Sequence, residues 1–306
     1  MPEVATTVDA RACFLRACEL DVEVRKPGNV SWSSPGHGMQ AAMFVDSAEA
    51  AAGPLFETGL RVGERIEAAV EATWAAVGCN TNLGILLLCA PIALAVEREP
   101  ASRTPGALRQ AVGEVLNELD VDDARAAYRA IARANPGGLG TAPAEDVRQA
   151  PRVGLRAAMS LAAERDLIAR QYRDGYADLF ERALPRLPSV FSPMPPRPVD
   201  LATTVAVQQL YLSLLSVFAD SHIVRKHGEP VAQNVMVAAQ GFARRAAQGG
   251  CLDADPAFMA WDSKLKARGI NPGTTADFTV ATLMVAGLTR PLGRRPEPAG
   301  ARWHGS

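Results

Sequence analysis

The densest group of chemically capable side chains lies at residues 220–228, which read DSHIVRKHG. Asp220 is a candidate ligand for Mg²⁺, which prefers a few carboxylates together with substrate phosphates, and His222 is a candidate for proton transfer. Arg225 and Lys226 offer cations for those phosphates. The alternative is structural, because basic side chains near the end of an apolar helix also complement the negative C-terminus of that helix.

A second polar group, Asn80, Thr81, Asn82 and Gly84, stands at the start of the most apolar run of the chain, residues 83–96. That run carries no charge, which suits a helix buried on every side. Asn80 or Thr81 is expected to cap the helix, and a helix N-terminus with free amides is a natural anion site. An ordinary capped core helix explains the same residues equally well.

A third group comes from two loops near the N-terminus. One holds Lys26, Gly28 and Asn29 in the sequence KPGN, and the other places His37 between two glycines. Glycine lets a ligand approach the backbone closely, and Lys26 can contact a phosphate as a point charge. The structural alternative is a turn with an exposed lysine and an idle loop histidine.

The fourth group is PGTTAD, residues 272–277, which precedes a final apolar helix. Thr274 and Asp277 are spaced like a capping box, with Asp in place of the usual Glu. Asp277 is a second candidate for holding a metal or for taking a proton. Thr274 and Thr275 are candidates for binding the substrate.

Helices must position these groups, since almost every segment shows helical periodicity and no stretch predicts a strand. The fold class is therefore all-α, a single-domain bundle of roughly ten helices around the buried helix at 83–96. We expect a domain at 11–290 between a flexible N-terminus at 1–10 and a flexible tail at 291–306. The helices are expected at 12–24, 39–51, 60–75, 83–96, 105–119, 123–134, 155–184, 203–219, 230–248, 256–268 and 278–288.

The stretch at 155–184 is the longest of these expected helices, and its centre, ERDLIARQY, is densely charged. Asp166, beside Arg165 and Arg170, is most simply part of an ion pair on the helix surface. Asp146 and Glu164 are further carboxylates in less distinctive settings.

The composition and the missing motifs exclude several classes of function. The 306 residues are 48% hydrophobic and carry a net charge of −1, which argues against a dedicated nucleic-acid binder. The apolar run is too short to cross a bilayer, and five cysteines without a CxxC pair are expected to be reduced thiols of a cytoplasmic protein. The sequence lacks GxGxxG after a strand, GxxxxGK[ST], HExxH and GxSxG. Small-molecule partners remain, with a homodimer as one option for assembly.

Six segments in order, spread over about residues 11–290, resemble the triphosphoribosyl-dephospho-CoA synthase family. They read KPGNV, GHGM, CNTNLGILLLCAP, YRDGYADLF, DSHIVRKHG and PGTTADFTVATLMVAG. The resemblance implies an all-α enzyme that moves the triphosphoribosyl part of ATP onto the 2′-hydroxyl of 3′-dephospho-CoA and releases adenine. It also implies nucleotide substrates, for which Mg²⁺ would neutralise the phosphates.

The central motif departs from the family pattern. Those synthases typically carry Asn-Thr-His-Lys-Gly, whereas this chain has Asn82 and Leu83 at the third and fourth positions. The NTNLG form resembles the branch of methanogens and methylotrophs, where it accompanies tetrahydromethanopterin-dependent one-carbon metabolism. An alternative is therefore phosphoribosyl transfer from phosphoribosyl pyrophosphate to an alcohol of a tetrahydromethanopterin precursor. A non-catalytic relative that binds a nucleotide is a further alternative.

In either transfer, the ribose passes through an oxocarbenium-like state while a carboxylate takes the acceptor proton. Asp220 and Asp277 are the candidates for metal or base, with His222 as a third candidate catalytic residue. The candidates for binding substrate and phosphate are Lys26, Gly28, Asn29, His37, Asn80, Thr81, Asn82, Gly84, Arg225, Lys226, Thr274 and Thr275.

Overall fold

A computed structural model describes residues 9–102, 104–136, 146–189, 191–192, 194–195 and 197–290. This part of the chain forms thirteen α-helices, α1 to α13, and no strand; two isolated β-bridges, Ser31–Ser34 and Gly36–Met39, close small loops. The all-α prediction is confirmed, with more and shorter helices than the roughly ten expected. The predicted N-terminal segment 1–10 and tail 291–306 lie largely or wholly outside the described residues.

The helices run as follows: α1 Ala10–Glu23, α2 Ala41–Leu55, α3 Val62–Val77, α4 Leu83–Arg98, α5 Pro105–Glu118, α6 Val121–Ala134, α7 Leu155–Ser160, α8 Leu167–Asp174, α9 Leu201–Leu215, α10 Ser221–His227, α11 Glu229–Ala246, α12 Pro256–Ala267 and α13 Gly273–Thr289. A π-helical turn at Asp178–Ala183 and a 3₁₀ turn at Leu184–Arg186 follow α8.

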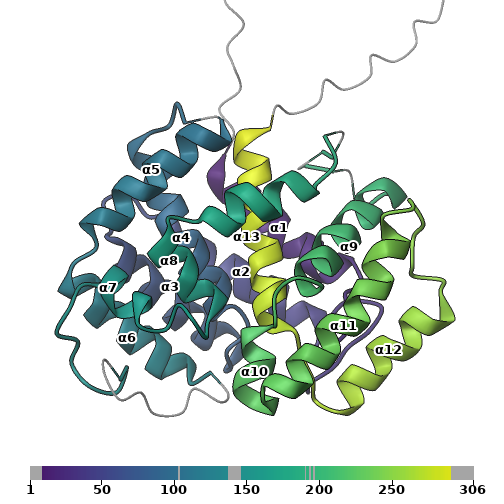
Figure 1. The fold of residues 1–306 in the computed structure, drawn as a ribbon. Helices are drawn as coiled ribbons and strands as arrows, with labels where there is room; N and C mark the ends of the chain where they lie inside the picture. Colours follow the sequence, from purple (N-terminus) through teal and green to yellow (C-terminus); the bar gives the residue numbers. More distant parts are fainter. Residues whose placement is uncertain are drawn as a thin grey trace, which may run out of the picture.

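Two helices are buried along most of their length. The expected core helix is confirmed as α4, in which 12 of 16 residues are buried. The last helix, α13, is more central, with 14 of 17 residues buried, and it packs against α1, α4 and α9. Figure 1 shows α13 in yellow running through the middle of the molecule. Both helices lack an amphipathic pattern because other helices surround them.

Helices α1 to α8 and α13, together with one face of α9, share the main hydrophobic core. A second hydrophobic cluster joins the inner faces of α9 to α12. In Figure 1 these groups lie on opposite sides of α13, with α3 to α8 at the left and α9, α11 and α12 at the right. None of the described helices combines the length and apolar character that crossing a membrane requires.

The predicted single helix at 155–184 is wrong. Asp166 interrupts it, because its carboxylate accepts hydrogen bonds from the amides of Ile168 and Ala169 and so caps a new helix, α8. Gly175 and Tyr176 then take left-handed backbone conformations, which end α8. The resulting turn at 161–166 carries Arg165 and Asp166 on a bend instead of a helix surface.

The predicted capping box at Thr274 and Asp277 is also wrong. Helix α13 begins at Gly273, and no side chain caps its first turn. The hydroxyl of Thr274 instead accepts a hydrogen bond from the backbone amide of His222, 3.1 Å away. Thr274 therefore ties the start of α13 to the start of α10, which frees Asp277 from a role in capping.

Candidate active site

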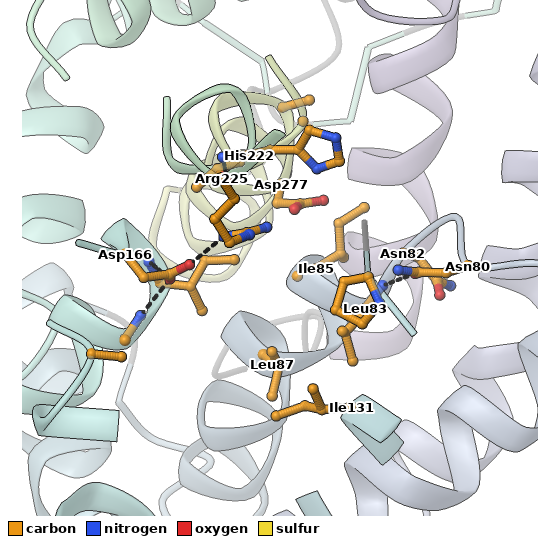
Figure 2. A pocket seen from close by; sticks show the side chains of 18 of the residues that line it. Asn80, Asn82, Leu83, Ile85, Leu87, Ile131, Asp166, His222, Arg225 and Asp277 are labelled. Atoms are coloured by element: carbon orange, nitrogen blue, oxygen red, sulfur yellow. Dashed lines mark hydrogen bonds and ion pairs between the residues drawn. The ribbon is translucent and has the colours of Figure 1, made fainter. Parts of the chain in front are cut away.

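A cavity of about 290 Å³ lies where the polar groups of the sequence meet. The starts of α4 and α13, the face of α10 and the turn before α8 surround it. Figure 2 shows His222, Arg225 and Asp277 on one side and the apolar side chains of Leu87 and Ile131 on the other. Its lining includes these predicted site residues: Asn29, Asn80, Thr81, Asn82, Gly84, His222, Arg225, Thr274 and Asp277. Segments far apart in the sequence thus form one site.

The other predicted residues lie behind the cavity wall or outside it. Their positions outside the lining do not test their predicted roles, but they show what each side chain contacts. These residues are Lys26, Gly28, His37, Asp220, Lys226 and Thr275.

Asp277 faces the cavity from near the start of α13, just beyond its first turn, and no hydrogen bond or ion pair within the described chain engages its carboxyl group. Burial raises the pKa of Asp277 well above its usual range, and the charges of Asp21 and Asp220 add to the rise. Gly84 makes this position accessible: a Cβ atom there would lie 2.1 Å from Oδ2 of Asp277 and 2.8 Å from Cδ1 of Ile168. The glycine of the NTNLG motif therefore gives the carboxyl group its space.

Asp220 joins α10 to α13. Its carboxylate accepts hydrogen bonds from the amide of Ile223 (3.0 Å), as the N-cap of α10, and from the amide and hydroxyl of Thr275 (2.7 and 2.8 Å). The side chain is almost completely buried, and burial raises its pKa. In this arrangement Asp220 positions the residues of α10 relative to Asp277.

Helix α10 presents His222 and Arg225 to the cavity. Nη1 of Arg225 lies 2.6 Å from Oδ2 of Asp166, the residue that caps α8, so the two cavity walls are linked by an ion pair (Figure 2). The predicted pairing of Asp166 with Arg165 and Arg170 is wrong, since Arg170 pairs with Asp178. Burial lowers the pKa of His222 to about 4, and the cations Arg225 and Lys226 contribute. The imidazole is therefore neutral at pH 7.

The NTNLG motif is held by hydrogen bonds that position α4. Oδ1 of Asn80 accepts a hydrogen bond from the amide of Leu83 (3.1 Å), and the hydroxyl of Thr81 donates to that of Ser47 (2.6 Å). Asn82 exchanges hydrogen bonds with the hydroxyl of Thr73. Asn82 precedes α4 directly, so the expected cap is shared: Asn82 takes the N-cap position, and Asn80 supplies the side-chain hydrogen bond.

The KPGN loop docks against the segment before α13. Gly28 has a φ of +82°, and a Cβ atom there would lie 2.7 Å from Cδ of Pro272, so both the conformation and the space require glycine. The amide of Gly28 donates to Oδ1 of Asp262 (2.8 Å), a completely buried carboxylate on α12. His37 closes the loop, with Nε2 2.7 Å from the carbonyl oxygen of Gly28, and burial lowers its pKa.

Lys26 points away from the cavity. Its side chain is completely buried, and Nζ lies 3.1 Å from Oδ1 of Asp21 and within hydrogen-bonding distance of the Asp21 carbonyl oxygen. Asp21, on α1, does line the cavity. Lys26 thus stabilises the ionised form of a cavity carboxylate, whose pKa burial raises and Lys26 lowers. Lys226 is exposed on the outer side of α10.

Sequence reasoning missed Asp21, Asp166, Arg165 and Asp262. Arg165 lines the cavity as an exposed side chain, and among the described residues it has no hydrogen-bond or ion-pair partner. One signal was available for Asp21, because it shares a face of α1 with buried Ala17 and Leu20, where an acid is unusual. For Asp166 and Asp262, the partners come from other helices, so local sequence gave no signal.

Comparison with known proteins identifies the family of this chain. The CitG family model, described as ATP:dephospho-CoA triphosphoribosyl transferase, matches residues 7–296. The chain belongs to the CitG family. The resemblance to triphosphoribosyl-dephospho-CoA synthases is thereby confirmed, and the chain is an enzyme of the triphosphoribosyl transferase class that uses ATP.

A solved structure shares the CitG fold of this chain. It is the crystal structure of an Archaeoglobus fulgidus protein with the provisional description triphosphoribosyl-dephospho-CoA synthase. The two are 24% identical with a TM-score of 0.62, and the match covers 79% of this chain and 96% of that one. No curated protein matches the sequence.

The cavity has fewer basic side chains in its lining than a triphosphate substrate leads one to expect. Arg165 and Arg225 are the arginines of the lining, against the aspartates Asp21, Asp146, Asp166 and Asp277. Leu83, which stands where the synthases typically have a lysine, is buried with 7% exposure and brings no charge to the start of α4. A polyphosphate at this site therefore needs more positive charge than the described side chains supply.

Proposed function

We propose that this cavity binds the ribose and triphosphate of ATP and transfers them to the 2′-hydroxyl of 3′-dephospho-CoA. The observation that carries this assignment is the carboxyl group of Asp277, which has no partner among the described residues and lines the same cavity as two arginines. In the reaction, the bond from ribose C1′ to adenine N9 breaks and a bond from C1′ to the acceptor oxygen forms. The electron pair leaves with adenine, which gains a proton, and the acceptor hydroxyl loses one.

Asp277 is the base in this proposal. Its carboxylate takes the proton of the acceptor hydroxyl, and its raised pKa makes it a stronger base than an exposed carboxylate. Its negative charge also favours the positive charge that develops on the ribose. Asp220 supports this role from behind the wall, where its hydrogen bonds to Thr275 fix the first turn of α13.

Arg165 and Arg225 bind the phosphates. Arg165 is without a partner among the described residues, and Arg225 has a buried Nε atom that makes no hydrogen bond, so both retain donors for a ligand. Guanidinium groups match phosphate oxygens in geometry as well as charge. Asp166 keeps Arg225 oriented toward the cavity through their ion pair.

Mg²⁺ fits this site as a companion of the substrate. The described residues contain no cluster of three or more acidic, histidine or cysteine side chains that could hold a metal ion alone. Asp277 offers a carboxylate oxygen at the cavity, and substrate phosphates would complete the shell, as Mg²⁺ prefers. When bound, the ion would neutralise phosphate charge in a cavity lined by more acids than bases.

Release of adenine tests the proposal. The enzyme is incubated with MgATP and 3′-dephospho-CoA, and adenine is quantified by chromatography. We expect turnover in the wild type and a loss of roughly 10²–10⁴-fold in Asp277→Asn, the range for removal of a general base. Full adenine release by Asp277→Asn would refute the assigned base.

A second candidate function is favoured by the start of α4. Asn82 and Leu83 replace the family's His-Lys pair, and both side chains are buried, so this position brings no extra cation for a triphosphate. Phosphoribosyl pyrophosphate would then be the donor and an alcohol of a tetrahydromethanopterin precursor the acceptor, as expected for a methanogen or methylotroph branch. Release of pyrophosphate, with no adenine formed from ATP, would select this function. Nucleotide binding without either product would select the non-catalytic alternative.

Assembly and location also stay predictions. A homodimer is tested by sedimentation velocity at several protein concentrations, and cytoplasmic location by fractionation of the source cells. A sedimentation coefficient that stays at the monomer value throughout would refute the homodimer.

A further inference from the structure

Asn29 lines the cavity wall and has a buried side-chain oxygen without a hydrogen-bond partner among the described residues. Its side chain is 3% exposed and lines the cavity wall. The amide nitrogen Nδ2 donates to Oδ1 of Asn271, 3.2 Å away, whereas Oδ1 of Asn29 is buried and accepts no hydrogen bond within the described chain. A buried acceptor without a partner is costly, so its persistence points to a ligand that donates a hydrogen bond here.

The neighbouring side chains share this chemistry. Asp21 and Asp277 line the same cavity, and the negative charge of Asp21 adds to the rise in the pKa of Asp277. Carboxyl groups offer acceptor oxygens in either protonation state. Asn29, Asp21 and Asp277 thus all line one cavity with hydrogen-bond acceptors, and we call this set of three residues the acceptor wall.

Without a bound metal ion, an acceptor wall is unsuited to phosphate. Ionised phosphate oxygens only accept hydrogen bonds and carry negative charge, so they match Arg165 and Arg225 and are repelled by carboxylates. Sugar hydroxyl groups donate hydrogen bonds and carry no charge. Asn29 therefore fits a hydroxyl group better than the phosphate that its position in the KPGN loop first indicated.

We propose that the acceptor wall is the ribose subsite of this enzyme, in which Oδ1 of Asn29 accepts a hydrogen bond from a ribose hydroxyl group of the substrate. The proposal rests on the proposed function, which brings ribose C1′ next to Asp277. It implies one orientation of the substrate in the cavity. The sugar hydroxyls contact Asn29 and Asp21, and the phosphates contact Arg165 and Arg225. The hydroxyl belongs either to ATP or to dephospho-CoA, since both contain a ribose.

Deoxy analogues test the hydrogen bond directly. Binding of MgATP, 2′-deoxy-ATP and 3′-deoxy-ATP is measured by calorimetry, followed by dephospho-CoA and its deoxyribose analogues. The wild type is expected to bind one of the parent compounds roughly 10-fold to 100-fold more tightly than one of its deoxy analogues. The analogue that loses affinity identifies both the nucleotide and the hydroxyl position.

Variants of Asn29 then assign the partner. Asn29→Leu removes the acceptor at similar volume and is expected to bind the parent and the deoxy analogue equally. Asn29→Asp keeps an acceptor oxygen and is expected to retain the preference. If Asn29→Leu does not fold, as judged by thermal unfolding, Asn29→Ala serves in its place, and the comparison of analogues on the wild type stands by itself.

Three results would overturn the subsite. The first is that the wild type binds every deoxy analogue as tightly as its parent compound. The second is that Asn29→Leu keeps the full preference for the parent compound. The third is that Asn29→Leu loses affinity for inorganic tripolyphosphate, which would show that Asn29 donates a hydrogen bond to phosphate instead. A wild type that binds ATP and dephospho-CoA, but prefers neither parent compound over its deoxy analogues, refutes this subsite alone. A wild type that binds neither ATP nor dephospho-CoA refutes the proposed function as well.

Discussion

At the scale of single residues, the carboxyl group of Asp277 has space because residue 84 is a glycine. Gly84→Ala introduces a methyl group 2.1 Å from Oδ2 of Asp277, so the carboxyl group and the start of α4 must move apart. We expect adenine release to fall at least 100-fold and the free energy of unfolding to fall by about 1–3 kcal/mol, as in other overpacked sites. Activity assays and chemical denaturation measure both effects.

Gly113→Ala is the matched control for this prediction. Gly113 also lies within a helix, α5, but a Cβ atom there would meet nothing within 4 Å. Because alanine is the better helix former, this variant should gain up to about 1 kcal/mol of stability and keep full activity. Equal activity in the two variants would show that the contact between Gly84 and Asp277 does not matter.

His222 makes the stability of the protein depend on pH. The pKa of the side chain falls from 6.5 in the unfolded chain to about 4 in the folded protein, so the unfolded state binds more protons between these values. The contribution of His222 is therefore fully present above pH 6.5 and is lost as the pH falls toward 4. The difference in melting temperature between wild type and His222→Asn should change across this window and stay constant above pH 7. A difference that is constant from pH 4 to pH 8 would contradict the neutral, buried imidazole.

Residue types could be predicted from the sequence, but their partners could not. The clusters around residues 26, 80, 220 and 274 do meet, because loops and helix ends concentrate polar groups. Lys26 and Asp220, however, turn inward to Asp21 and Thr275, and no local pattern distinguishes a cation behind a cavity wall from one that faces it.

At the scale of elements, α10 is held in place by one carboxylate. Asp220→Ala removes the N-cap of α10 and leaves the buried amide and hydroxyl of Thr275 unpaired. We expect a loss of about 3 kcal/mol, from about 1 kcal/mol for the cap and about 2 kcal/mol for the unpaired groups. Thermal and chemical unfolding measure the loss, and kcat should fall because α10 carries His222 and Arg225.

Asp200→Ala provides the comparison for this element. Asp200 caps α9 through the amide of Thr203 (2.8 Å) and lies on the surface away from the cavity lining. Its loss should amount to about 1 kcal/mol with no change in kcat. If the two variants lose equal stability, the bond between α10 and α13 contributes nothing beyond capping.

Helix positions could be predicted well where a continuous apolar run or a proline at the start marks the helix, as in α4, α5 and α12, and poorly where other polar residues set the boundaries. The stretch 155–184 has helical composition throughout, yet Asp166 gains more from capping α8 and pairing with Arg225 than from continuing one helix. That break creates the turn that lines the cavity. Arg165 and Asp166 were therefore missed, because they lie in the stretch where the helix prediction was wrong.

At the scale of the whole molecule, the cavity lies where α4, α8, α10 and α13 meet, so a bound ligand contacts several helices at once. MgATP at 100 times its dissociation constant should raise the free energy of unfolding by about 2.7 kcal/mol, if it binds only the folded protein. Hydrogen exchange should slow in α8 and in α10, which contact the ligand from opposite sides. Protection limited to one of these helices would contradict a ligand that spans the cavity.

The docking of the KPGN loop against the segment before α13 also has a consequence for biosynthesis. Asn29 and Asn271 are 242 positions apart, so a ribosome adds the second of them tens of seconds after the first, at ordinary rates of translation. Throughout that interval α1 displays the apolar face that α13 will cover, and the acceptor wall lacks Asp277. A nascent chain of this enzyme is therefore inactive until its last described helix emerges, and it offers chaperones a hydrophobic helix for nearly the whole of its synthesis.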